Sequence, residues 1–379
     1  MSHVRRAVAG ALCAAAIAVP LFSGSFLSPM FPSAANGAVT PAVDAVASLR
    51  TQQLPGTDPT TGSGAWDSDP TVAFVTPEAV LAVAEAGQTG TSWSTSDALA
   101  AVQATRNSDG QDPLAFVDLM EAAATTPGAA GKFIVLVAGP LGRDTSSLAT
   151  IVGDPAPNGS FDADLFFNNT LYAGLSKRVT AGSVPASTVA YVASKQKRSN
   201  GGWSYDADTG TTTDADIDTT GLALQLLLAG GTSPTDPVVQ RGLAFLASQQ
   251  NADGTWSFFG DESAESSSRA LLAVTAAGYD VNDRCWRDTV YPAGVGAPFA
   301  GGDAALASLA NPDGSIAGPN VFSVSFATAQ AVQGLERSWL PLVRAPAQVC
   351  TVVSPVEVTA PPVAQPAPTA VALTPAFTG

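Results

Sequence analysis

A short turn motif recurs along this chain, and each copy lies between two stretches with helical periodicity. The motif consists of a turn-forming residue, a glycine, any residue and then an apolar residue. A series of such units predicts a repeat architecture, because so short a helical pair buries its apolar face only against neighbouring pairs. The copies read SGAW at 63–66, NGSF at 158–161, NGGW at 200–203, DGTW at 253–256 and DGSI at 313–316, with a degraded copy, DGQD, at 109–112.

The helices on the two sides of each motif differ in character. The second helices begin at Ser, Thr or Asp and end at glycine, which are preferred cap residues. The segment at 221–229 is apolar on nearly every face, as expected of an inner helix. The first helices, such as 238–250, are more amphipathic and suit an outer layer. We therefore predict an all-α fold, an α6/α6 toroid or double ring of helical hairpins, over 39–350. Its repeats are expected at about 42–87, 91–143, 145–182, 185–231, 235–280 and 302–337.

The aromatic residue of the motif has an expected structural role. Glycine allows the turn a backbone conformation that side chains disfavour, so the aromatic ring can fold back between one hairpin and the next. Trp203 and Trp256 are therefore predicted to fill the seams of the ring, and ligand contact is their alternative role.

Both ends of the chain differ from the repeats. Residues 1–38 combine Arg5 and Arg6 with an apolar stretch and small residues that suit cleavage, which predicts a secretory signal peptide. An uncleaved membrane anchor is the alternative, although Pro20 disfavours a spanning helix. No segment of the mature chain is apolar enough to span a bilayer. Residues 351–379, rich in Pro, Ala and Thr, predict a disordered tail. The expected location is extracellular, at the cell surface or associated with the cell wall.

Charge and rare residues exclude several functions. The formal net charge is −15, which disfavours nucleic acid as a partner. The only histidine, His3, lies in the predicted signal, and its removal excludes Ser-His-Asp catalysis and metal sites that need imidazole. Cys13 leaves with the signal too. Cys285 and Cys350 are then expected to form a disulfide; two unrelated buried thiols are the alternative.

Two segments, 195–231 and 245–260, carry a family resemblance. They contain NGGW and DGTW, and they resemble the glutamine–tryptophan repeats of the squalene cyclase/prenyltransferase repeat superfamily. The resemblance covers roughly 42–340 and is strongest at about 185–280. It implies an α/α toroid with a central cavity, a fold that serves unrelated functions.

The family's class II cyclases carry an Asp-x-Asp-Asp-Thr motif whose middle aspartate protonates the substrate. Aligning Thr219 with the motif's threonine puts Asp218 on the last aspartate and Ile217 on the proton donor, and isoleucine carries no acidic proton. The form DIDTTGLAL resembles more closely the helical domain of cobalamin carriers. This resemblance implies a non-catalytic module that binds a small molecule or a cell-surface protein. The alternative is a terpenoid cyclase- or prenyltransferase-like enzyme whose acid is Asp214, Asp216 or Asp218.

Three groups of residues are candidates for contact with a ligand or ion. The N-termini of the inner helices suit a polar or anionic ligand, although their hydroxyl and carboxyl groups can simply cap the helices. The aspartates of loop 205–218 can bind calcium, or remain a solvated acidic loop without metal. No other cofactor is expected. The ligand-binding candidates are Asp218, Thr219, Trp203, Tyr205, Trp256, Phe258 and Phe259; the calcium candidates are Asp206, Asp208, Asp214 and Asp216; the helix-terminal candidates are Thr76, Thr170, Asp218, Thr219, Ser266, Ser267 and Ser323.

Overall fold

The computed structural model describes residues 40–90, 92–161, 166–319, 321–340 and 343–344. These residues are mostly α-helical, as predicted, and the strands among them form two small antiparallel hairpins, β1–β2 and β3–β4. The predicted signal peptide and the predicted tail lie outside the described residues. None of the helices in these ranges is both long and apolar enough to cross a membrane.

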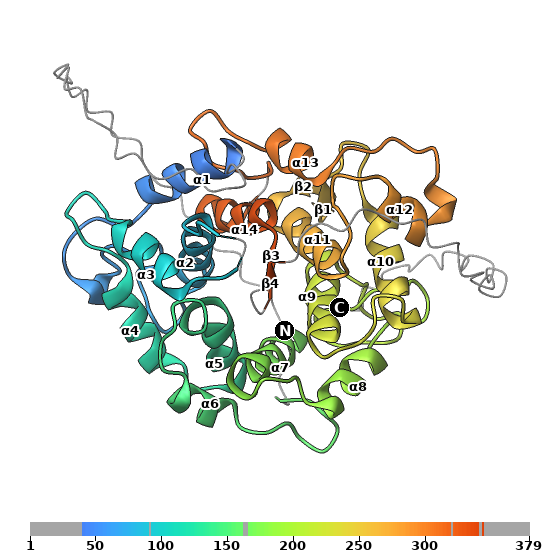
Figure 1. The fold of residues 1–379 in the computed structure, drawn as a ribbon, viewed down its shortest axis with the longest axis horizontal. Coiled ribbons are helices and arrows are strands. Elements are labelled where there is room, and N and C mark those ends of the chain that lie inside the picture. The colour runs from blue at the N-terminus through green and yellow to red at the C-terminus, as the bar shows by residue number, and fades with distance from the viewer. Residues whose placement is uncertain (1–39, 91, 162–165, 320, 341–342, 345–379) are drawn as a thin grey trace, which may run out of the picture. The chain divides into compact units, whose positions relative to one another are not determined.

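Six helical segments form the centre of the described structure (Figure 1). α2 contacts the π-helical segment η2, which continues α5; α5 packs on α7, α7 on α9, α9 on α11, and α11 on α14. α14 then packs on α2, so the series of contacts closes on itself. The bounds are α2 Val75–Ala86, α5 Pro127–Phe133, η2 Ile134–Ala138, α7 Phe167–Ala181, α9 Ile217–Ala229, α11 Ala264–Ala276 and α14 Val324–Glu336.

The other helices lie outside this central series (Figure 1). α1 contacts α2 and α14, α3 contacts α2, α6 contacts α5 and α7, and α8 contacts α9. α10 packs against α9 and α11, and α13 against α11 and α14. Each of the six repeats expected from the sequence therefore contains one central and at least one outer helix. The outer helices are α1 Thr40–Thr51, α3 Thr95–Ala104, α4 Leu114–Ala123, α6 Ser146–Val152, α8 Ala186–Ser194, α10 Pro237–Gln249, α12 Cys285–Val290 and α13 Gly302–Ser308.

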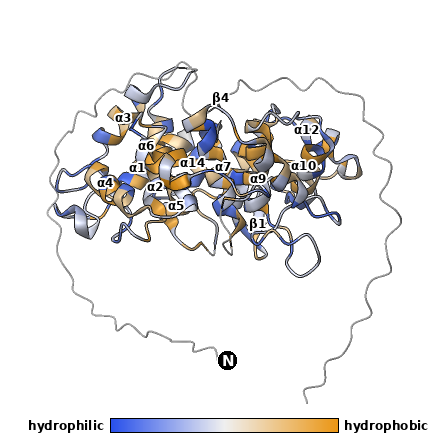
Figure 2. Ribbon diagram, turned by 90° about the horizontal axis from the view of Figure 1, so that it is seen from below, coloured by the Kyte–Doolittle hydropathy of each residue, from blue (hydrophilic) through white to orange (hydrophobic). Residues whose placement is uncertain are grey.

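The central helices are buried because apolar residues occupy nearly every face. Figure 2 shows this hydrophobic character along α2 and α9, and almost all residues of both helices are buried. Two glycines bring neighbouring backbones close. A Cβ on Gly131 of α5 would lie 2.7 Å from the Cα of Ala173 on α7, and one on Gly221 of α9 would lie 2.5 Å from the carbonyl oxygen of Arg269 on α11.

The turn motif joins an outer helix to a central helix through Trp256, which is fully buried. Its indole Nε1 donates to the Leu246 carbonyl of α10 at 2.8 Å, and its backbone N–H donates to the Ser267 hydroxyl of α11 at 2.9 Å. Gly254 has a φ of +87°, and a Cβ there would lie 2.5 Å from the carbonyl oxygen of Ala300. The motif thus ties three consecutive segments together, as the sequence predicted for its aromatic residue.

The same bonds recur around the series. Trp66 and Trp203 make both of them, whereas Phe161 and Ile316, which have no side-chain donor, make only the backbone bond. The indole acceptors are the carbonyls of Leu49 and Val192, and the hydroxyl acceptors are those of Thr76, Thr220, Thr170 and Thr328.

Candidate functional site

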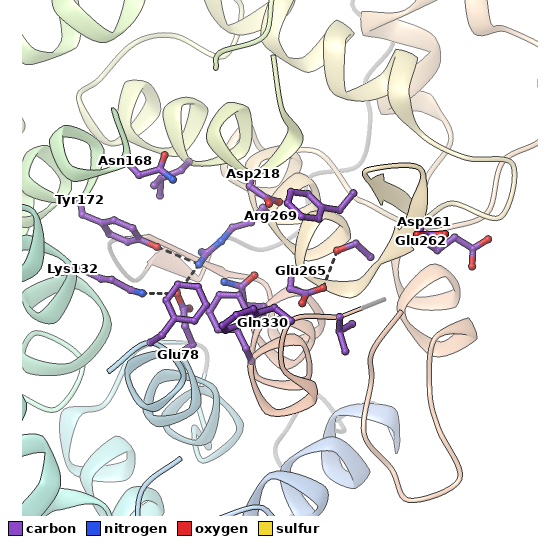
Figure 3. Close-up of a pocket in the computed structure, with 17 residues that line it drawn as sticks. Glu78, Lys132, Asn168, Tyr172, Asp218, Asp261, Glu262, Glu265, Arg269 and Gln330 are labelled. Atoms are coloured by element: carbon purple, nitrogen blue, oxygen red, sulfur yellow. Dashed lines mark hydrogen bonds and ion pairs between the residues drawn. The ribbon is translucent and has the colours of Figure 1, made fainter. Parts of the chain in front are cut away.

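A cavity of about 430 Å³ lies among the first two turns of the central helices (Figure 3). Charged and aromatic side chains make up most of its lining. The charged residues are Glu78, Lys132, Asp218, Asp261, Glu262, Glu265 and Arg269; the others are Phe74, Asn168, Tyr172, Leu222, Phe258, Ser263, Val321, Phe322, Phe326 and Gln330.

Glu78 organises the charges on one side of the cavity. This carboxylate is buried on α2, and its Oε1 accepts a hydrogen bond from Arg269 Nη2 at 2.9 Å. Lys132 Nζ lies 3.8 Å from the same oxygen, and Gln333 donates to Oε2 at 2.9 Å. Arg269 also donates to the Tyr172 hydroxyl at 3.2 Å. Burial raises the pKa of Glu78, but the charges of Arg269 and Lys132 outweigh this effect and hold the pKa below its usual range.

Asp218 presents a second carboxyl group to the cavity, from the first turn of α9. Its Oδ1 atom is buried and accepts no hydrogen bond from the described residues. The Ser266 hydroxyl lies near enough to lower the pKa of Asp218, but among the described residues it makes no hydrogen bond of ordinary geometry. Burial, with a further contribution from the charge of Asp216, raises the pKa of Asp218 to about 7. Arg269, whose charge lowers the pKa of Asp218, is hydrogen-bonded to Glu78, so Asp218 shares this cation with another carboxylate.

The raised pKa of Asp218 predicts a pH dependence of stability. The unfolded chain releases this proton near pH 4, whereas the folded protein retains it to about pH 7. The contribution of Asp218 to the stability of the folded protein should therefore be fully present below pH 4. It should be lost as the pH rises from about 4 to 7. We expect Asp218→Asn to reduce this fall in melting temperature, measured between pH 4 and 8. An unchanged profile would show that Asp218 titrates normally.

Aromatic side chains flank the opening of the cavity on two sides. Phe258 belongs to the hairpin of β1 (Trp256–Phe258) and β2 (Asp261–Ser263), and it is 48% exposed. On the other side, Phe74 stacks on Phe326 at a centroid distance of 4.2 Å and meets Phe322 edge-on at 5.7 Å. Phe322 is 85% exposed. The exposed rings therefore provide apolar surface beside a charged interior.

The residues predicted to bind a ligand fall into different places. Asp218 and Phe258 line the cavity. Tyr205 and Phe259 are exposed outside its lining. Trp203, Trp256 and Thr219 are buried and are not part of the lining, so we assign them a structural role.

The polar groups at the helix N-termini are largely used within the fold. Thr76, Thr170 and Ser267 accept backbone hydrogen bonds from the turn motifs. Ser323 and Asp216 cap α14 and α9 by accepting from the Phe326 and Thr219 amides. The acidic side chains in the first turns of α2, α9 and α11, which are Glu78, Asp218 and Glu265, face the positive ends of the helix dipoles. Carboxylates of the chain therefore already compensate the positive ends of these three helices. From the sequence, a polar or anionic ligand was expected there instead.

Sequence reasoning did not find Glu78, Lys132 or Arg269. A single charged residue within an apolar helix was the available indication, since Arg269 lies in the run SSSRALLAV and Glu78 in TPEAVLAV. Charged residues are rarely buried unless they are paired.

The aspartate loop has an internal cation. Lys197 is buried, and its Nζ lies 3.2 Å from Asp208 Oδ2 and 2.9 Å from the Gly210 carbonyl oxygen. Asp206 Oδ2 accepts from the Thr213 hydroxyl at 2.6 Å. Backbone N–H groups of the loop, with Lys197, lower the pKa of Asp208 to about 2. The described residues contain no group of three or more potential ligands placed to hold a metal ion.

The sequence left two possibilities for Asp206, Asp208, Asp214 and Asp216, a calcium site or an acidic loop without metal, and the contacts of Lys197 favour the second. Because Lys197 already compensates Asp208, we expect titration with CaCl₂ to give neither heat nor a gain in melting temperature. Stoichiometric heat that disappears in Asp208→Asn would instead establish a calcium site.

Cys285 is disulfide-bonded in the structure. Both of the chain's other cysteines, Cys13 and Cys350, lie outside the described residues. The pairing of Cys285 with Cys350 therefore remains a prediction.

Comparison with known proteins adds no relative: no protein-family model matches the chain, and no curated protein matches it either.

Proposed function

We propose that this chain is an exported α/α toroid that binds a small ligand in its central cavity without transforming it. The toroid is supported by the closed series of contacts among the central helices. The observation that carries the binding function is the cavity itself, about 430 Å³ with polar groups at one side and exposed aromatic rings at its opening. Pockets for small molecules commonly have this size and this combination of surfaces.

The opposite part of the central space is filled by the chain itself. Leu340 is fully buried, and its backbone N–H donates to Gln225 Oε1 of α9 at 2.9 Å. β3 (Ser338–Trp339), which precedes Leu340, contacts α11 and α14. This arrangement supports a one-sided cavity that a ligand enters from the N-terminal ends of the central helices.

The charge of the lining favours binding over cyclisation. Carbocation chemistry needs a dry cavity of aromatic and aliphatic groups, whereas charged side chains, Glu78 and Arg269 among them, make up a large part of this lining. Ile217, which aligns with the cyclase proton donor, is not part of the lining. The sequence-based location at the cell surface, which rests on residues 1–38, is part of this proposal.

One observation favours a second function, an enzyme that uses Asp218 as a general acid or base. Its pKa of about 7 suits proton transfer near neutral pH. Neither Asp214 nor Asp216 lines the cavity, so Asp218 is the aspartate on which this alternative depends. Chemical conversion of a bound molecule that Asp218→Asn abolishes, while binding persists, would establish it.

Native mass spectrometry of the secreted protein tests the binding function. We expect a co-purified small molecule, released unchanged on denaturation. Asn168→Trp should remove it, because Asn168 lines the cavity and the larger ring fills the space. Thr212→Trp is the matched control, since it adds the same ring to an exposed position of the aspartate loop. A molecule retained equally by both variants would place the binding site elsewhere.

A further inference from the structure

We propose that the ligand of the central cavity is an organic cation with an apolar body, and that Asp218 holds its positive charge. This inference rests on the proposed function, because it names the ligand class of the same cavity.

The balance of charges in the lining is negative. The residues that line the cavity carry five carboxyl groups and two cationic groups. Both cations lie next to Glu78, with Arg269 hydrogen-bonded to it and Lys132 3.8 Å away. Arg269 Nη1 has no hydrogen-bond acceptor among the described residues, but the charge of this side chain is already compensated by Glu78. A ligand therefore meets a surplus of negative charge, which attracts a cation and repels an anion.

Asp218 is the group that such a cation would satisfy. Its buried Oδ1 accepts no hydrogen bond from the described residues, and an unpaired buried acceptor costs stability. Glu265, by comparison, accepts a hydrogen bond from the Ser263 hydroxyl at 2.8 Å. An ammonium group beside Asp218 would supply a hydrogen-bond donor to Oδ1 and a positive charge that is not shared with Glu78.

The aromatic rings at the opening suit the rest of such a ligand. Phe258 on one side and Phe74 and Phe322 on the other are exposed, and an apolar body between them would remove their surface from water. The faces of these rings also attract cations. Lys132 already shows this, since its Nζ lies 4.8 Å from the centre of the Phe74 ring.

A matched series of three ligands tests the proposal: 3-phenylpropylammonium, 3-phenylpropanol and 3-phenylpropionate. They share one apolar body and differ in the charge of the end group. In isothermal titration calorimetry at pH 8, we expect the ammonium compound to bind best and the carboxylate worst. Asp218→Asn should weaken binding of the ammonium compound about tenfold or more and leave the alcohol nearly unaffected. Asp214→Asn, in the exposed loop, should leave all three unchanged.

The proposal also predicts a pH dependence of the affinity. The charged and titratable groups around Asp218 are Asp216 at the N-cap of α9, Glu265 and Arg269 on α11, Tyr172 on α7, Glu78 on α2 and Lys132 on α5. Because the pKa of Asp218 is about 7, affinity for the ammonium compound should rise between pH 5 and 8. Asp218→Asn should lose most of this rise.

The possible outcomes distinguish a failure of the cation proposal from a failure of the proposed binding function. If the alcohol or the carboxylate binds best and Asn168→Trp abolishes its binding, the cavity is a ligand site but the cation proposal is wrong. If no member of the series binds and no molecule co-purifies, the binding function itself fails. Equal binding of the ammonium compound to wild type and Asp218→Asn would remove Asp218 from the site.

Discussion

Replacing Trp256 by alanine is expected to lower the free energy of unfolding by about 3–5 kcal/mol, the usual cost of removing a fully buried tryptophan. Trp256 has no exposed surface. Its ring stacks on Trp286 at a centroid distance of 6.4 Å, and its indole N–H bonds to the Leu246 carbonyl. The substitution therefore leaves a cavity between α10, α11 and α12 together with an unpaired carbonyl group.

Two further variants show which property of Trp256 matters. Trp256→Phe keeps most of the ring but loses the indole donor, so it should cost less than alanine. Phe259→Ala, only three residues along the chain, removes a ring that is 93% exposed and should change stability by about 0.5 kcal/mol or less. Chemical denaturation monitored by circular dichroism measures all three. Equal stability of Trp256→Ala and Phe259→Ala would contradict the structural role of the motif.

The second large effect is expected from Glu78→Gln, which should destabilise the protein by about 3–5 kcal/mol because it leaves the buried guanidinium of Arg269 without its partner. Arg269 is almost fully buried, and Lys132 lies beside it. The comparison is Glu121→Gln, whose partner Arg143 is partly exposed and also pairs with Asp118, so that loss should be about 1 kcal/mol or less.

Charge balance can be tested directly at Glu78. Adding Lys132→Met to Glu78→Gln removes one of the two cations and should recover part of the lost stability. The pKa of Glu78 is lowered in the folded protein, so its contribution is present at neutral pH and lost as the pH falls below the ordinary carboxyl range. Glu78→Gln should therefore weaken the acid dependence of stability. A double variant no more stable than Glu78→Gln, measured by urea denaturation, would argue against this explanation.

The helical fold and the seam residues could be predicted because they depend on local patterns. The spacing of glycine and the following aromatic residue marks the turn, and the capping residues mark the helices beside it. Trp256 follows from this pattern without any knowledge of long-range contacts. Asp218 also followed from a local pattern, the sequence DIDTTG at the start of α9.

The centre of the cavity could not be predicted in the same way. Glu78, Lys132 and Arg269 come from three helices that meet only when the central series closes, and no local spacing relates them. The aspartate loop shows the same limit, because Lys197 lies outside the run of carboxylates that it compensates. The composition of this loop suggested a metal site, whereas in the fold the ammonium group of Lys197 lies among its carboxylates.

Closure of the helical series is the claim on which the cavity depends, and one distance tests it. Ser325 at the start of α14 donates a hydrogen bond of 2.5 Å to Gln52, which follows α1, although 273 residues separate them. Spin labels on cysteines that replace Gln52 and Ser325 would report this distance by double electron–electron resonance. A closed ring predicts one short, narrow distance distribution. A long distance, comparable with the length of a row of six helical pairs, would show that the two ends of the series never meet.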